Sequence, residues 1–290
     1  NLAARVVAYN FDNDGFIDAD GADKVEDVNT SKTKGGRLAL KWDINESSSL
    51  NFTYLNQVIE VGANQLITST YTPLPAPESC PCPAPADLQA PSLSALTRQY
   101  DDENYNYNTE AINLKLDKEF EGFNLSIMTA RNEQTRHRRE VVNNFVGSTV
   151  PGRLFINQKI DEKVDTAEIR LVSGKESGAL FDWITGFWYQ DRENASRTLT
   201  VDKDLTVTLF GLDFVDGDSI EDRLALDLFS EKALYGEIGL HLTDKATLTL
   251  GYRRSDIERD AGGFEFANGI FDGAQAALVG LQGNEVQEDV

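Results

Sequence analysis

The chain has 290 residues, of which 40% are apolar, and it carries a formal net charge of −21. This acidic balance excludes nucleic acid as a partner, because phosphate binding needs a cationic surface. No run of about 18 apolar residues occurs, which excludes a helical membrane span. A membrane β-barrel stays open, because its strands alternate in polarity.

Apolar and polar residues alternate in many short segments, which is typical of strands that hide one face. In chain order we expect about nine strands, over residues 2–11, 36–43, 50–57, 105–117, 123–127, 165–172, 181–190, 234–242 and 246–253. The last two form the clearest hairpin. Leu234 and Leu240 share one side of its first strand, whereas Tyr235 and Glu237 share the other.

Four tight turns alternate with four long polar connections between the predicted strands. The connections cover residues 12–34, 62–104, 132–162 and 191–230. The second contains seven of the eight prolines, so it cannot form a ladder and is predicted to be an exposed loop. We interpret the basic cluster Arg136 to Arg139 as a solvated loop segment, and Thr198 to Phe210 as a strand inside a loop. Beyond Arg259 we expect no strand.

This alternation of short and long connections favours an all-β, antiparallel transmembrane β-barrel. In hydrocarbon every backbone donor and acceptor must be paired internally, so a spanning sheet has to close on itself. Such barrels have short periplasmic turns, long extracellular loops, apolar side chains toward lipid and polar ones toward the lumen. Trp42, Phe123 and Trp183 fall beside the predicted turns, where an interfacial aromatic girdle would lie.

Several segments together resemble the TonB-dependent receptors of the Gram-negative outer membrane. The resemblance is carried by Arg5 to Tyr9 with Gly15 to Asp18, Gly35 to Trp42, Thr166 to Leu171, Phe181 to Gln190, and Ala233 to Arg254. It implies an energised receptor that takes up a scarce nutrient such as an iron chelate, cobalamin or an oligosaccharide. It also implies an N-terminal plug within a barrel of twenty-two strands.

Residues 1–290 depart from this family pattern at both ends. They contain no plug-like segment, no energy-coupling box and no terminal strand that finishes on an aromatic residue. We therefore interpret the chain as part of a single β-barrel domain, an incomplete segment of about nine strands. The expected partners are outer-membrane lipid and lipopolysaccharide, a small-molecule nutrient, and an inner-membrane energy-coupling complex acting through the missing plug. No cofactor is expected.

Two alternatives remain open at this point. One is a passive outer-membrane barrel, and the other is a soluble secreted β-sandwich that binds glycans or calcium, since such a sheet also hides one face. An enzyme is the least supported, because the sequence has no G-x-S-x-G, no H-E-x-x-H and no phosphate loop. Its two histidines, His137 and His241, are expected at opposite rims.

Ligand-binding candidates are aromatic and basic residues expected near the ends of the long loops, where binding sites collect on a rigid scaffold. They are Tyr105, Tyr107, Arg131 and Trp188. Each also fits a simpler role in barrel packing or in the rim girdle.

Two further motifs suggest metal sites. Asp12, Asp14 and Asp18 stand at alternate positions around Gly15, as oxygen ligands do in a calcium loop, but the twelfth position is Gly21 rather than Glu. A polar loop is the simpler interpretation. Cys80 and Cys82 lack the second ligand pair that zinc requires, so a strained disulfide or two free thiols are the alternatives.

Overall fold

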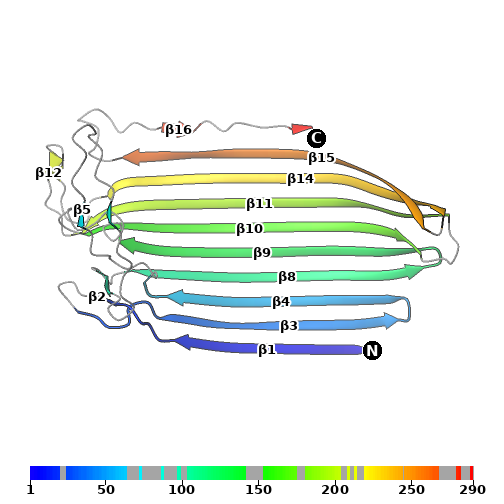
Figure 1. Ribbon diagram of the computed structural model, residues 1–290, viewed down its shortest axis with the longest axis horizontal. Coiled ribbons are helices and arrows are strands. Elements are labelled where there is room, and N and C mark those ends of the chain that lie inside the picture. Colours follow the sequence, from blue (N-terminus) through cyan, green and yellow to red (C-terminus); the bar gives the residue numbers. More distant parts are fainter. Residues whose placement is uncertain are drawn as a thin grey trace.

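A computed structural model describes residues 1–19, 24–63, 103–141, 153–174, 180–203, 219–243 and 245–267, together with seven further short strands (Figure 1). No helix that could cross a membrane occurs among these residues. The described parts of the chain are built from strands and the turns between them.

Nine long strands make up the sheet. They are β1 (Leu2–Asn13), β3 (Ser31–Asn45), β4 (Ser48–Val61), β8 (Asn104–Phe120), β9 (Phe123–Val141), β10 (Arg153–Ser173), β11 (Phe181–Lys203), β14 (Ser219–Thr243) and β15 (Ala246–Ala267). Each pairs antiparallel with the next in this order, so the sheet is a simple meander. Its two short additions are β16 (Val279–Leu281) and β17 (Glu288–Asp289), which both pair with β15.

The remaining strands are two residues long and form three two-stranded sheets. They are β2 (Asp18–Ala19) with β7 (Thr97–Arg98), β5 (Thr72–Pro73) with β6 (Ala86–Asp87), and β12 (Thr208–Leu209) with β13 (Leu212–Asp213). A sandwich needs two large sheets packed face to face. Within the described residues there is one large sheet, so the predicted sandwich alternative is wrong.

Short turns and long connections lie at opposite ends of the sheet, as the sequence predicts (Figure 1). The turns follow β3, β8, β10 and β14, and the long connections follow the strands between them. His137 lies near the long-connection end of β9 and His241 near the turn end of β14, so their predicted separation is confirmed.

The strands are longer than predicted at the long-connection end. The basic cluster at residues 136–139 lies in β9 rather than in a loop. Thr198 to Lys203 continues β11 instead of beginning a separate strand within a loop, and β15 runs past Arg259 to Ala267. In the β9 extension polar residues occupy both faces, so the apolar alternation is lost although backbone pairing continues.

Register assigns every side chain to one of two faces, because residues paired across antiparallel strands share a face and neighbours along a strand alternate. One face, the belt face, carries an apolar belt across all nine long strands. The belt includes Leu2, Val6, Leu38, Leu40, Leu50, Phe52, Ile112, Leu114, Leu125, Ile127, Ile169, Leu171, Trp183, Phe187, Leu234, Ile238, Leu248 and Leu250. The other face, the polar face, carries charged, amide, hydroxyl and aromatic side chains.

The belt is exposed in the described chain. Val6 is 74% exposed, Leu250 60% and Tyr252 72%. A sheet is ordinarily stable only when its apolar face is buried against another layer. The described residues supply no such layer, so the belt needs an apolar environment from outside these residues.

Beyond β1, the described residues 14–19 and 24–30 are hydrogen-bonded to one another and form a cap. The Asn29 Oδ1 atom accepts hydrogen bonds from the backbone N–H groups of Phe16 and Ile17 at 2.7 and 2.8 Å. Ile17 is thereby buried, and Gly15 has no room for a Cβ beside the Asp27 carbonyl. This cap lies at the long-connection end.

Candidate functional site

Aromatic and cationic side chains meet on the polar face near the long-connection end of β8 and β9. Tyr107 pairs in register with Arg136, and Tyr105 with Arg138. We call these four residues the loop-end wall. The guanidinium groups present planar donor arrays, and the phenol rings offer apolar surfaces with a polar tip. This combination suits a ligand that is both anionic and aromatic.

Ion pairs hold both arginines of the loop-end wall. Arg136 Nη2 lies 2.8 Å from Glu162 Oε2 on β10, and Arg138 Nη1 lies 3.4 Å from Glu140 Oε2. Arg136 Nε is buried and has no hydrogen-bond partner in the described part of the chain. Both guanidinium groups are therefore oriented by carboxylates, and that of Arg136 is not fully satisfied by its carboxylate.

A second cluster lies on the polar face of β11, β14 and β15, in the row that contains Glu162 and in the next polar-face row toward the belt. Asp227 Oδ2 accepts from Arg192 Nη2 at 2.8 Å, and Asp227 Oδ1 accepts from Arg259 Nε at 2.9 Å. The Arg192 guanidinium also lies 5.5 Å from the centre of the Phe229 ring. Two cations share one carboxylate here, so the cluster carries a net positive charge.

Closer to the turns, hydrogen bonds between side chains join strands on the polar face. Glu231 Oε1 accepts from Arg253 Nη2 at 2.5 Å and from Ser255 Oγ at 2.9 Å. The Tyr235 hydroxyl donates to Glu168 at 2.5 Å, and its ring lies over Gly186, where a Cβ would collide with it. These hydrogen bonds connect neighbouring strands, so they stiffen the wall.

Trp188 also lies on the polar face, but away from the loop-end wall. Its register partners are Glu168 and Ala233, and it is eight residues closer to the turns than Ser196, which aligns with Arg136. Eight strand residues span about 26 Å. Its predicted position beside a long loop is wrong, because β11 continues to Lys203.

Arg131 lies on the belt face, opposite the other three predicted ligand residues. It falls in the middle of β9, and its guanidinium forms two hydrogen bonds to Asp165, at 2.6 and 3.0 Å. Its predicted position near a loop end is therefore wrong. The sequence could have predicted its face, because Arg131 lies an even number of residues from the apolar Leu125 and Ile127, and such residues share one face of a strand.

Asp12, Asp14 and Asp18 do not converge. Asp12 is on the belt face, 3.9 Å from the Lys32 ammonium, and Asp18 Oδ1 accepts the backbone N–H of Asp27. Within the described ranges, no three side chains of His, Cys, Asp or Glu are grouped to hold a metal ion. Cys80 and Cys82 lie outside the described residues.

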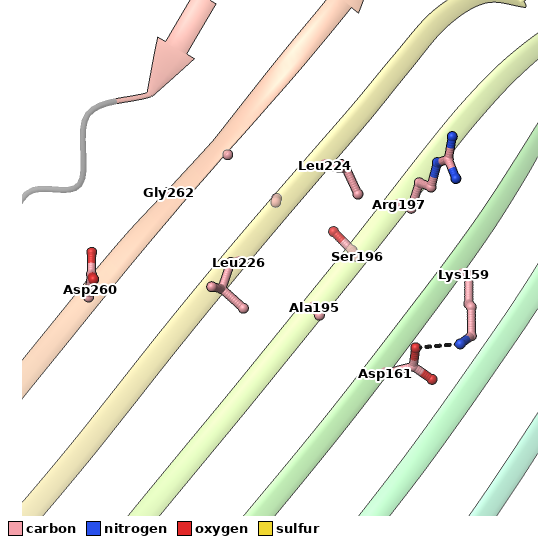
Figure 2. Close-up of a pocket in the computed structure, with 11 residues that line it drawn as sticks. Lys159, Asp161, Ala195, Ser196, Arg197, Leu224, Leu226, Asp260 and Gly262 are labelled. Carbon is pink, nitrogen blue, oxygen red and sulfur yellow. Dashed lines mark ion pairs between the residues drawn. The ribbon is translucent and has the colours of Figure 1, made fainter.

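A hollow of about 570 Å³ lies on the belt face beyond the apolar belt, across β10, β11, β14 and β15 (Figure 2). Its rim is polar and its floor includes Ala195, Leu224 and Leu226. Lys159 is held by Asp161 at 2.7 Å and Arg197 by Asp222 at 2.7 Å. The rim cations are thus neutralised, and the hollow is on the wrong face to join the loop-end wall.

Several candidate functional residues are not identified by the sequence alone. Arg136 and Arg138 were assigned to a solvated loop, and Arg192, Asp227 and Arg259 are far apart in sequence. The first two carried a usable signal, since they continue the even-numbered polar face of β9. The cluster around Asp227 depends on the register of three strands, which a single sequence does not specify.

Solved structures with a similar fold are receptors, one of which is described as a receptor of the outer membrane. No protein-family profile and no curated protein matches the sequence. The chain is similar to the ferric yersiniabactin uptake receptor FyuA from Yersinia pestis, with a TM-score of 0.65 and 13% identity over 100% of this chain and 38% of that one. The chain therefore spans less than half the length of the solved chain.

Two further structures agree with this similarity. The ferripyoverdine receptor of Pseudomonas aeruginosa has a TM-score of 0.60 at 13% identity, covering 92% of this chain and 36% of that one. The ferric-catecholate import receptor Fiu from E. coli K12 has a TM-score of 0.60 at 12% identity, covering 100% and 42%. The fold is a segment of β-barrel wall. At this level of identity the likeness establishes the fold alone.

Proposed function

We propose that this chain is part of an outer-membrane, TonB-dependent uptake receptor. In this proposal the belt face contacts lipid and the polar face lines the lumen. The observation that carries it is the continuous, exposed apolar belt across nine antiparallel strands, bounded by charged residues toward the long connections. The similarity to solved siderophore receptors supports the same interpretation.

The orientation follows from the two ends of the sheet. In bacterial outer-membrane barrels the short turns are periplasmic and the long loops extracellular. The loop-end wall would then face the outside, where it meets a ligand first. Lipopolysaccharide would surround the belt, and an inner-membrane energy-coupling complex would act through a plug supplied elsewhere in the receptor.

We further propose a ferric chelate as the ligand class. The similar solved receptors are named for ferric yersiniabactin, ferripyoverdine and ferric catecholates. Anionic chelate oxygens fit the guanidinium donors of Arg136 and Arg138, since charge-assisted hydrogen bonds are the strong ones. Aromatic chelate rings fit Tyr105 and Tyr107, which offer offset stacking.

The proposed mechanism involves binding and release without covalent chemistry. The arginines attract and orient the chelate, and the cluster around Asp227 offers a second cationic level closer to the membrane. A chelate that moves from the loop-end wall to this cluster remains next to cationic side chains, which compensate its negative charge. Inward movement then requires a change elsewhere in the receptor, because the hydrogen-bonded sheet itself is rigid.

Two arginines of the same strand provide the test. The variant Arg136→Ala removes a polar-face guanidinium, whereas Arg131→Ala removes a belt-face guanidinium and serves as the matched control. Binding of a panel of ferric catecholates and hydroxamates is measured by fluorescence titration of the detergent-folded protein. We expect Arg136→Ala to weaken binding of the preferred chelate about 10- to 100-fold, the worth of a hydrogen bond to a charged group.

The control should bind the chelate with unchanged affinity. Equal losses in the two variants, or no loss in Arg136→Ala, would contradict the assignment of the loop-end wall. A protein that binds no ferric chelate in the panel would contradict the ligand class.

A further inference from the structure

A hollow of about 650 Å³ interrupts the apolar belt where β11, β14 and β15 meet. Its centre is Gly236, which pairs with Thr185 on one side and Tyr252 on the other. On β14 the neighbouring belt positions are Leu234 and Ile238. The hollow thus has a backbone floor between apolar side chains, and we call it the Gly236 groove.

No described part of the chain requires glycine at residue 236. The nearest atoms to a Cβ there would be the Ile184 carbonyl oxygen at 3.4 Å and the Thr185 hydroxyl oxygen at 3.6 Å, which are ordinary contacts. By contrast, a Cβ on Gly186 would collide with Tyr235 on the polar face. Because Gly236 has no side chain, space is left on the belt face of the sheet rather than between packed residues.

Two cations stand directly above the groove, at the edge of the belt toward the long connections. Arg254 pairs in register with Leu234, and the next belt-face row places Lys232 opposite Asp256. Both cations are exposed, and neither forms an ion pair with another described residue. Long cationic side chains at such an edge extend toward the headgroup layer while their stems cover apolar surface.

We propose that the Gly236 groove holds an acyl chain of a membrane lipid whose phosphate is bound by Arg254 and Lys232. The belt supplies the apolar environment and the two cations the charge complementarity. A lipid is the occupant that matches both, because it places an anionic head above a hydrocarbon chain. This proposal rests on the membrane location proposed above.

Trp183 makes the groove measurable, because it lines the hollow while Trp42 lies on the belt face of a distant strand. Single-tryptophan variants of the intact protein are folded into phosphatidylcholine vesicles, with the other tryptophans replaced by phenylalanine. Brominated phosphatidylglycerol or brominated phosphatidylcholine is then added at equal mole fractions. Quenching of each tryptophan reports which lipid contacts it.

We expect Trp183 to select phosphatidylglycerol over phosphatidylcholine by about 25-fold in relative affinity, from two cations worth about fivefold each. Trp42 should show no comparable preference. The double variant Lys232→Gln with Arg254→Gln should abolish the preference at Trp183. Gly236→Leu should reduce quenching at Trp183 by both lipids and leave Trp42 unchanged, and Gly236→Ala, which has room in the fold, should reduce it less.

Each outcome separates this inference from the proposed function. Quenching of Trp183 that does not respond to Gly236→Leu or Gly236→Ala would overturn the acyl-chain site. Equal affinity for the two lipids at Trp183 would overturn the phosphate site. Absence of quenching at both tryptophans would overturn the membrane location itself, and the groove assignment with it.

Discussion

An arginine placed in the middle of the apolar belt tests the membrane location most directly. Leu250 pairs with Ile238 at the centre of the belt on β14 and β15, and it is 60% exposed. Leu226 is on the same face of β14 and is 41% exposed, but it lies twelve residues from Ile238. Twelve strand residues span about 40 Å, which exceeds the roughly 25 Å height of a membrane belt.

The two substitutions Leu250→Arg and Leu226→Arg therefore differ in environment and not in chemistry. In a bilayer the first should cost about 2–4 kcal/mol of folding free energy, the known range for arginine at the midplane of a barrel. The second should cost at most about 1 kcal/mol, because surface substitutions away from special features are usually small. In water both positions are exposed, so neither change should cost much.

Reversible folding into phospholipid vesicles provides the measurement. The protein is titrated with guanidinium chloride, and tryptophan fluorescence gives the free energy of unfolding for the unmodified protein and each variant. A loss at Leu250→Arg that is at least 1 kcal/mol larger than the loss at Leu226→Arg supports the lipid-facing belt. Similar small losses in both variants would refute the reasoning from exposure and alternation.

Three further expectations use the same folding assay. Asp227→Ala leaves Arg192 and Arg259 without their shared acceptor, so it should cost about 1–3 kcal/mol; a neutral result would show that water replaces the carboxylate. Gly186→Ala should cost about 1–3 kcal/mol by collision with Tyr235, while Gly236→Ala should be nearly neutral; equal costs would contradict the difference between the faces. On the strand extensions beyond the belt, the hydrogen bond from Arg197 holds the pKa of Asp222 below its usual value. The stabilisation from this pair should therefore be full at neutral pH and be lost as pH falls below about 4, through the lower pKa of the folded state; Asp222→Asn should flatten that part of the pH profile, and an unchanged profile would contradict the pairing.

The sequence was sufficient to predict the strands near the turns and, in the last hairpin, their two faces. There the belt requires an apolar residue at every second position. The alternation in Leu234 to Leu242 and Leu248 to Leu250 therefore shows which side of each strand belongs to the belt. The same reasoning located the tight turns, because alternation stops and resumes within a few residues. In these segments the backbone is paired and one face must also be apolar. Only the second condition leaves a pattern in the sequence.

Strand length could not be predicted, because the burial requirement ends where the belt ends. In β9 the residues from Asn132 onward are mostly polar on both faces, yet they pair with β8 as far as Arg139 and with β10 as far as Val141. Backbone hydrogen bonds do not depend on side-chain polarity. The candidate site was affected most, because Arg136 and Arg138 lie in this extension, and the cluster at Asp227 also needs the register of β11, β14 and β15.

The long strand extensions place the loop-end wall far from the apolar belt. The 25 residues of β14 measure roughly 80 Å along the strand, and the belt occupies only its last part. On β10, Ile160, which aligns with Arg136, lies seven residues or about 23 Å from Ala167 at the belt edge. Under the proposed function, a ligand held by the loop-end wall would thus still be outside the bilayer. Under the proposed function, evolution can alter the choice of cargo at the top of the wall without disturbing the part that anchors the protein in lipid.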